Sequence, residues 1–333
     1  MSAVFNDDFL ITSDQYSEVM ESQVLPWLKE KEVPKNIPGK ENRNLYTVFY
    51  GAENPIGTVL IVHGFTENAY KYAELIFSLL HNQLSVIAYD QRGHGRSWRP
   101  EGLADLSVTH VDHFEDYVDD LKAVYNYYGP PGKYSRSTRP FFVFSHSMGG
   151  AVTSLFLEEF PEVFKAAVLC APMIAPYTNG VPQPIANAVC RIACACGKSK
   201  KYPFFMKPWS GPEDFSTSCA TDPQRFAWYD AVKTSNECFH NCVPTYGWTR
   251  ESLAVTDKIL AKGAPEKIMC PVLLFTAEND CNVLPEPQEA FISRVPQGRR
   301  VFVREARHEI YRSADTVLFP WWHSILEFYL SHA

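Results

Sequence analysis

Short apolar runs alternate with longer segments of helical periodicity along most of this 333-residue chain. The runs are rich in β-branched and aromatic residues, which predicts strands at 45–50, 58–63, 84–90, 141–145, 165–172, 270–277 and 299–306. Between them, apolar residues recur every three or four positions and predict helices at 68–82, 113–128, 149–160, 286–295 and 317–333. This alternation predicts an α/β fold with a mostly parallel central sheet flanked by helices.

The segment 176–250 breaks this pattern. It is dense in proline, cysteine and aromatic residues and contains no convincing strand, but it is too apolar for a solvated linker. We therefore expect a core formed by 44–175 and 251–333, an insertion at 176–250, and an N-terminal extension, 1–43, packed on the core. The apolar run "PIANAVCRIACAC" (184–196) is suited either to lining an acyl channel or to packing on the core as a buried helix, and we favour packing on the core.

Charge and cysteine content narrow the class of protein. The net charge of −7 argues against a nucleic-acid partner. The first residues do not resemble a signal peptide, and no apolar stretch reaches the ~18 residues of a membrane span. We expect a cytoplasmic protein whose odd number of cysteines, nine, stay reduced and mostly buried.

The cysteines of the insertion are also candidate zinc ligands. The residues concerned are Cys190, Cys194, Cys196, Cys238, His240 and Cys242. No CxxC pair is present, and the first three cysteines lie in the apolar run described above. We therefore expect no metal.

The stretch "FFVFSHSMGGAV" (141–152) resembles a nucleophile turn, in which a strained strand-to-helix junction raises a serine hydroxyl above the edge of a sheet. Ser147 occupies the central position and Gly149 the downstream small-residue position. Ser145 replaces the usual upstream glycine but is still small. By itself, Ser147 could equally be a helix N-cap.

A nucleophilic serine needs a base and an acid that orients the base. Asp280 follows the predicted strand 270–277, with Glu278 as the alternative acid, and His308 follows the strand 299–306. All three would lie at the carboxyl edge of the sheet, in the order serine, acid, histidine. Each has an ordinary structural interpretation, but their joint order favours a catalytic triad of Ser147, Asp280 and His308.

Attack on an ester generates an oxyanion, which backbone N–H groups stabilise. The amide of Met148, next to the nucleophile, is one expected donor. The second is the amide of Phe65 in "HGFTEN" (63–68), where His63 and Gly64 are interpreted as structural.

The motifs "HGFTEN", "YDQRGHGRS", "SHSMGGA" and "RHEI" resemble the serine α/β-hydrolases of the monoglyceride lipase and lysophospholipase group, and most of all bacterial lysophospholipase. The resemblance extends from about residue 44 to the C-terminus. It implies a triad at the three residues above, an eight-stranded core and a helical cap over the acyl site. "RGHGRS" (92–97) is assigned to loop structure, because the dinucleotide fingerprint is incomplete.

The expected activity is hydrolysis of the acyl ester of single-chain lipids, most of all lysophospholipids, through an acyl-enzyme on Ser147 and without a cofactor. Monoacylglycerol lipase and general carboxylesterase activity are the alternatives, and an inactive scaffold is a remote one. In the insertion, Lys198, Lys200 and Lys201 are candidate ligands of the lipid phosphate. These lysines and their aromatic neighbours could also make the insertion a peripheral membrane contact, or form an ordinary solvated loop.

Overall fold

The computed structural model describes residues 9–130 and 139–333. Ten strands are found in these residues: β1 (Glu32–Pro38), β2 (Asn44–Tyr50), β3 (Gly57–Val62), β4 (Leu84–Tyr89), β5 (Val108–Thr109), β6 (Phe141–His146), β7 (Ala166–Cys170), β8 (Val243–Pro244), β9 (Val272–Ala277) and β10 (Gly298–Val303). Eight of them form one sheet in the order β1-β2-β4-β3-β6-β7-β9-β10. From β4 to β10 all neighbouring strands are parallel, and β1 and β2 add two antiparallel pairings at one edge.

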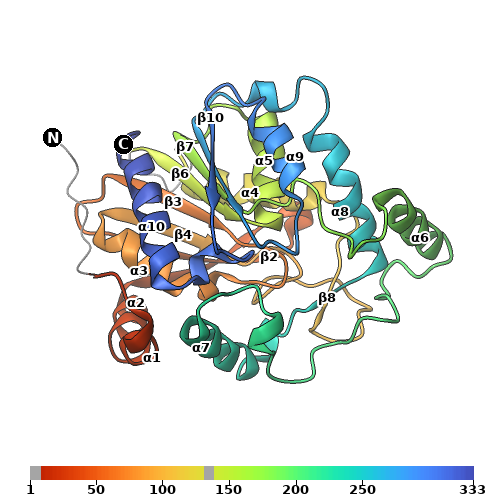
Figure 1. Cartoon of the computed structure of the whole chain (residues 1–333), viewed down its shortest axis with the longest axis horizontal. Helices are drawn as coiled ribbons and strands as arrows, with labels where there is room; N and C mark the ends of the chain where they lie inside the picture. Colours follow the sequence, from red (N-terminus) through yellow and green to blue (C-terminus); the bar gives the residue numbers. More distant parts are fainter. Residues whose placement is uncertain (1–8, 131–138) are drawn as a thin grey trace.

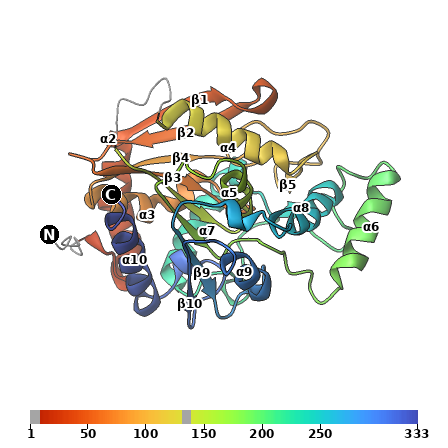
Figure 2. The ribbon, with the colours of Figure 1, turned by 90° about the horizontal axis from the view of Figure 1, so that it is seen from above.

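The α-helices of the described residues are α1 (Tyr16–Val19), α2 (Leu25–Lys31), α3 (Ala73–His81), α4 (Glu115–Tyr128), α5 (Met148–Glu159), α6 (Gln183–Ala195), α7 (Pro223–Thr234), α8 (Tyr246–Ile259), α9 (Pro285–Ile292) and α10 (Asp315–Leu330). Figure 1 shows the sheet running through the middle of the molecule, and Figure 2 shows α4 and α10 on opposite sides of it. The expected α/β fold with a mostly parallel sheet is confirmed.

Alternation along the central strands divides the core into two layers. Val59 and Ile61 of β3 belong to the layer that contains α2, α3 and α10. Leu60 and Val62 of the same strand belong to the layer that contains α4, α5 and α9. Successive side chains of a strand point to opposite faces, so a strand covered by helices on both faces is apolar throughout. This explains the unbroken apolar runs in the sequence.

The N-terminal region contributes more than the sequence predicted. Tyr16, Met20 and Val24 are buried in the core, and β1 pairs with β2 as an edge strand that was not foreseen. β1 contains two prolines and is largely exposed. An edge strand tolerates both features, because its outer backbone groups face solvent and need no partner strand. It therefore lacks the apolar pattern that revealed the other strands.

The insertion at 176–250 holds α6, α7 and the start of α8, and none of its residues joins the main sheet. The interpretation of 184–196 as a helix buried against the core is wrong. The segment does form a helix, α6, but only Cys190 in it is buried. Figures 1 and 2 show α6 at one end of the molecule, beyond α8. The division into core, insertion and extension remains a prediction about domains.

Two further findings concern membrane-spanning helices and the cysteines. No helix in the described part of the chain is both long and apolar enough to span a bilayer. All nine cysteines are free in the structure. The expectation that most are buried is wrong: three are buried, four are of intermediate exposure and two are exposed.

Candidate active site

Ser147 lies at the junction between β6 and α5, in a backbone conformation rare for a side-chain-bearing residue. Its φ is 51° and its ψ is −119°. Such a conformation costs about 1–3 kcal/mol and persists only where the surroundings hold it. Two hydrogen bonds hold it here: Ser147 N donates to Cys170 O at 3.1 Å, and Met173 N donates to Ser147 O at 2.8 Å. In this conformation the hydroxyl of Ser147 lies 2.8 Å from the ring of His308.

The small residues around Ser147 are required by a close approach of backbones. A Cβ at Gly149 would lie 2.2 Å from Val62 O and 2.6 Å from His63 O. No side chain fits there, so β3 and α5 can meet only at glycine. Ser145 is fully buried, with its Oγ 3.4 Å from Val168 O, so the upstream position accepts a serine.

His308 joins Ser147 to Asp280. Its Nε2 lies 2.8 Å from Ser147 Oγ, and its Nδ1 lies 2.7 Å from Asp280 Oδ2. The second oxygen of Asp280 accepts from the amides of Asn282 (2.8 Å) and Val283 (3.0 Å), which fixes the carboxylate. Glu278, the alternative acid, is exposed and accepts instead from the amide of Glu305. His308 is therefore within hydrogen-bonding distance of both Ser147 and Asp280, the residues expected to act with it.

Burial and neighbouring charges have opposite effects on the pKa values of Asp280 and His308. Burial alone would raise the pKa of Asp280, but the neighbouring His308 and the two amides outweigh it, so the pKa is lowered. Burial alone would lower the pKa of His308, but the carboxylate of Asp280 outweighs it and raises the pKa. The arrangement therefore stabilises an imidazolium beside an ionised carboxylate, which is what a general base needs after it takes a proton.

The loop after β3 brings a second backbone amide toward the nucleophile. A Cβ at Gly64 would lie 3.0 Å from Ser147 Cβ, so this loop passes directly beside the serine. Phe65 follows, and among the described residues its amide donates to no other backbone group. Met148 is the first residue of α5, where helix geometry leaves the amide without an intrahelical acceptor. Both amides expected to bind an oxyanion are thus free of backbone acceptors.

The residues interpreted as structural supports have that role. His63 Nδ1 donates to Gly64 O at 2.7 Å, and His63 Nε2 accepts from Gln91 N at 2.9 Å. Asp90 accepts from the amides of Ala69 and Arg96, which ties the loop after β4 to the loop after β3. These bonds stabilise the loops that surround Ser147.

A buried cluster of ionisable residues, which the sequence did not predict, lies behind the site. It consists of Glu67, Lys71, His146 and Glu309, each at most 12% exposed in its side chain. Three of these residues lie inside motifs already recognised, "HGFTEN", "SHSMGGA" and "RHEI". The presence of ionisable residues inside motifs of otherwise small or apolar residues could have indicated this cluster, because buried charges require partners.

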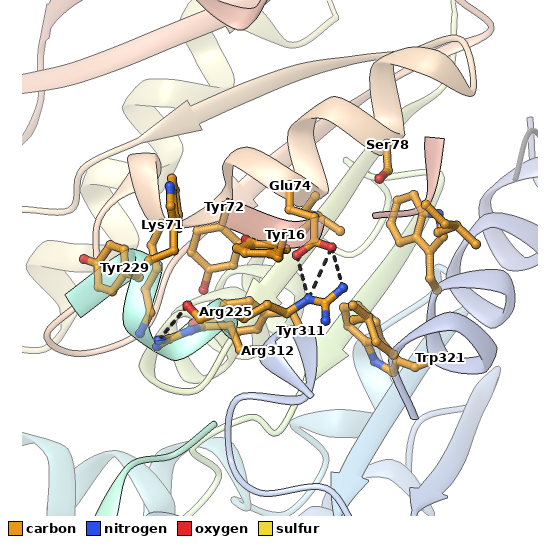
Figure 3. Close-up of a pocket in the computed structure, with 15 residues that line it drawn as sticks. Tyr16, Lys71, Tyr72, Glu74, Ser78, Arg225, Tyr229, Tyr311, Arg312 and Trp321 are labelled. Carbon is orange, nitrogen blue, oxygen red and sulfur yellow. Dashed lines mark hydrogen bonds and ion pairs between the residues drawn. The ribbon is translucent and has the colours of Figure 1, made fainter. Parts of the chain in front are cut away.

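A small cavity of about 30 Å³ lies beyond this cluster, between α3, α7 and α10. Figure 3 shows Glu74 hydrogen-bonded to the guanidinium of Arg225 in the wall of this cavity, which Lys71, Tyr72 and Tyr311 also line. At ~10–15 Å³ per water molecule, the cavity could hold about two waters and is too small for an acyl chain.

The structure does not bring the candidate lysines of the insertion to the triad. Lys198, Lys200 and Lys201 are exposed. Lys200 Nζ donates to Glu101 O at 2.9 Å, and Lys201 O accepts from Tyr246 N at 2.8 Å. Within residues 9–130 and 139–333, no hydrogen bond or ion pair joins these lysines to the triad.

Several characterised proteins resemble this chain in sequence. Lysophospholipase L2 of Escherichia coli is 30% identical over 293 residues, which cover 86% of this chain and 84% of the relative. Human monoglyceride lipase is 29% identical over 153 residues, covering 43% of this chain and 47% of the relative. The resemblance is therefore strong over most of the chain for the first and partial for the second.

Solved structures resemble it in fold. A carboxyl esterase of Bacillus coagulans in complex with glycerol matches with a TM-score of 0.69 at 16% identity, over 90% of this chain and 98% of the other. The monoacylglycerol lipase of Paleococcus ferrophilus matches with a TM-score of 0.65 at 20% identity, over 87% and 99%. In addition, the family model described as "Serine aminopeptidase, S33" matches residues 53–315. This chain therefore belongs to that family of serine hydrolases and has the α/β-hydrolase fold.

Proposed function

We propose that this protein is a carboxylic ester hydrolase that cleaves the acyl ester of single-chain lipids. Its similarity to lysophospholipase L2 and to monoglyceride lipases supports this substrate class. The observation that carries the proposal is the hydrogen-bonded chain from Ser147 Oγ through His308 to Asp280, at 2.8 and 2.7 Å. An ordinary surface serine has no such base beside it.

In the proposed mechanism Ser147 Oγ attacks the acyl carbonyl while His308 Nε2 takes its proton. The amides of Met148 and Phe65 stabilise the oxyanion of the tetrahedral intermediate. His308 then protonates the departing alcohol oxygen, which leaves the acyl group on Ser147. A water molecule, deprotonated by the same histidine, releases the fatty acid, and Asp280 holds the imidazole in the required tautomer throughout.

The deciding experiment measures fatty-acid release from lysophosphatidylcholine and from monoacylglycerol of the same chain length. Wild type and Ser147→Ala are compared, with Ser145→Ala as the control because it changes a buried serine two residues away that does not contact His308. Loss of release only in Ser147→Ala supports the proposal. Release from neither lipid by the wild type would favour the inactive scaffold, and equal release by both variants would remove Ser147 from the mechanism.

Within this substrate class we favour lysophospholipids, and with them a peripheral contact of the insertion with membranes. α6 exposes Ile185, Val189 and Ile192 at 56%, 53% and 66%, and the following loop exposes Phe204 at 91% and Phe205 at 67%. The candidate lysines lie between these two apolar groups in the sequence. Apolar side chains beside lysines suit the interface of an anionic bilayer.

A sedimentation assay with vesicles of phosphatidylglycerol or of phosphatidylcholine tests this contact. Each lysine near an anionic surface contributes about 1 kcal/mol, so a triple Lys→Gln variant at 198, 200 and 201 should bind anionic vesicles roughly 100-fold more weakly. The matched control changes the exposed Lys35, Lys262 and Lys267. Equal loss in both triple variants would indicate a general charge effect, and preference of the wild-type enzyme for monoacylglycerol would contradict phosphate recognition.

A further inference from the structure

His146, the residue before the nucleophile, has an acceptor oxygen facing each of its ring nitrogens. Its Nδ1 lies 3.1 Å from Glu67 Oε2, and its Nε2 lies 3.1 Å from the main-chain oxygen of His308. A neutral imidazole has one N–H donor and one nitrogen lone pair. Either neutral tautomer would therefore point a lone pair at an oxygen, in a side chain that is only 2% exposed. Both contacts are favourable only if both nitrogens carry protons.

His63, in the adjacent loop, is equally buried and has the opposite surroundings. Its Nδ1 faces the acceptor Gly64 O, but its Nε2 faces a donor, the amide of Gln91. One donor and one acceptor satisfy a neutral ring, and burial lowers the pKa of His63. The two histidines therefore differ in their hydrogen-bond partners, although both are buried.

Glu67 supplies the negative charge that His146 requires. Its Oε2 also accepts from Gly64 N at 2.5 Å and from Tyr72 OH at 2.6 Å. Its Oε1 accepts from Lys71 Nζ at 3.2 Å and from the hydroxyl of Tyr311. Burial alone would raise the pKa of Glu67, but His146 and then Lys71 outweigh it and hold the pKa well below its usual value.

Glu67 is connected to the loop that carries His308 through two separate sets of contacts. Lys71 Nζ, bound to Glu67, also binds Glu309 Oε1 at 2.6 Å, and Glu309 follows His308 directly. Through His146, Glu67 reaches the carbonyl of His308 itself. The titratable groups around His146 are therefore Glu67, Lys71, Glu309 and His308. The ring centroid of His308 lies 4.7 Å from that of His146, and the ring centroid of Tyr311 lies 5.1 Å from it.

We propose that Glu67 and a His146 that carries protons on both ring nitrogens form a buried ion pair that positions the active site. Glu67 holds the amide of Gly64 and so the loop that presents Phe65 N, while the imidazolium of His146 holds the main-chain carbonyl of His308. One ion pair thereby sets the distance between the oxyanion amides and the general base. The positioning role rests on the catalytic functions proposed above for Ser147 and His308.

The first test is spectroscopic and does not depend on activity. In the full-length protein labelled with ¹⁵N-histidine, the spectrum at about pH 8 should show a proton on each ring nitrogen of His146. His146→Gln identifies the resonances. In Glu67→Gln, which is isosteric, His146 should become a neutral ring at about pH 8. A singly protonated His146 in the wild type at that pH would overturn the proposal.

The second test is kinetic, with an ester substrate. Displacement of catalytic groups by about 1 Å can cost roughly 100-fold, so Glu67→Gln and His146→Gln should each lower kcat about 10–100-fold and change KM less than about twofold. In His146→Gln the acid limb of the pH profile should also move up by about one unit, because the cation opposing protonation of His308 is gone. In Glu67→Gln the limb should stay near its wild-type position, since loss of the carboxylate and neutralisation of His146 offset each other.

The matched control is His110→Gln. His110 is fully buried and contacts Thr245 and Asp112, but neither catalytic residue, so kcat, KM and the pH profile should not change. Unchanged kcat and pH profile in both active-site variants would overturn the positioning role. Should Ser147→Ala retain full activity, the proposed function would fail, and the ¹⁵N spectrum would still decide the charge of His146.

Discussion

The strongest structural constraint near the nucleophile is the contact between α5 and the end of β3, and Gly149→Ala tests it. An added Cβ would lie 2.2 Å from Val62 O and 2.6 Å from His63 O, and both of these atoms belong to backbone. To reach an ordinary contact of about 3.4 Å, the carbonyl of Val62 would have to retreat by roughly 1.2 Å. Backbone in a parallel sheet cannot make this movement alone, so the loop that follows must move with it.

Two opposing terms determine the stability of this variant. Overpacking of a rigid contact costs about 1–3 kcal/mol. Replacing glycine by alanine in a helix gains at most about 1 kcal/mol, and less in the first turn. Overpacking therefore wins, and we expect the free energy of unfolding to fall by about 1–2 kcal/mol, measured by urea denaturation.

The effect on catalysis should be larger than the effect on stability. The displaced loop carries Phe65, whose amide is the proposed oxyanion donor, and a shift of about 1 Å near reacting atoms can cost roughly 100-fold in rate. We expect kcat for ester hydrolysis to fall by about this factor. Gly51→Ala is the control, because a Cβ there would meet only Phe49 at 3.5 Å. Wild-type kcat and stability in Gly149→Ala would refute this account of the junction.

Three further predictions follow from groups near the site and in the core. Asp280→Asn keeps the side-chain shape but removes the carboxylate that selects the tautomer of His308, so kcat should fall about 10⁴-fold in an ester-hydrolysis assay with little change in melting temperature. Burial raises the pKa of Glu158 to about 8, so the wild-type protein should lose stability as the pH rises from about 4.5 through 8 and this carboxyl ionises in the folded state. The Glu158→Gln variant has no such group, so its free energy of unfolding in urea, relative to that of the wild type, should be higher at pH ~9 than at pH ~4. A hydrogen bond with Cys219 lowers the pKa of Cys281 to about 6, so iodoacetamide should modify Cys281 faster than the exposed Cys196 at pH ~7, as followed by peptide mass spectrometry.

Neighbouring residues provide the controls for these experiments. Glu278→Gln alters a carboxylate two residues from Asp280 that does not contact His308, and it should retain activity; a loss as large as that of Asp280→Asn would contradict the assignment of the acid. Glu159→Gln changes the exposed neighbour of Glu158 and should show no such pH dependence. Equal alkylation rates of Cys281 and Cys196 would show that Cys281 is not a thiolate at this pH.

The main elements could be read from the sequence because local patterning and burial agree. The predicted strand 141–145 is observed as β6, Phe141–His146, and the predicted helix 113–128 as α4, Glu115–Tyr128. In the segment 68–82 the α-helix begins only at Ala73, after a 3-10 turn. Core strands covered on both faces must be apolar, so their sequences reveal them.

The outer elements could not be predicted in the same way. β1 is an exposed edge strand held by its backbone pairing with β2, and backbone pairing leaves little trace in side-chain pattern. α6 has an apolar composition typical of a buried helix, yet it contacts mainly α8 and leaves Ile192 66% exposed. Composition shows that a segment is apolar, but the tertiary structure decides what covers it.

By itself, the sequence determined the α/β fold, the position of Ser147 on a strand-to-helix turn, and Asp280 and His308 as its candidate partners. These features depend on local pattern and chain order. Only the tertiary structure decided that Asp280 rather than Glu278 faces His308, and that Glu67 and His146 meet behind the site, 79 residues apart in the chain. The physical reason is that a buried charge is stabilised by partners that folding brings from distant segments, and no local periodicity records which partners those are.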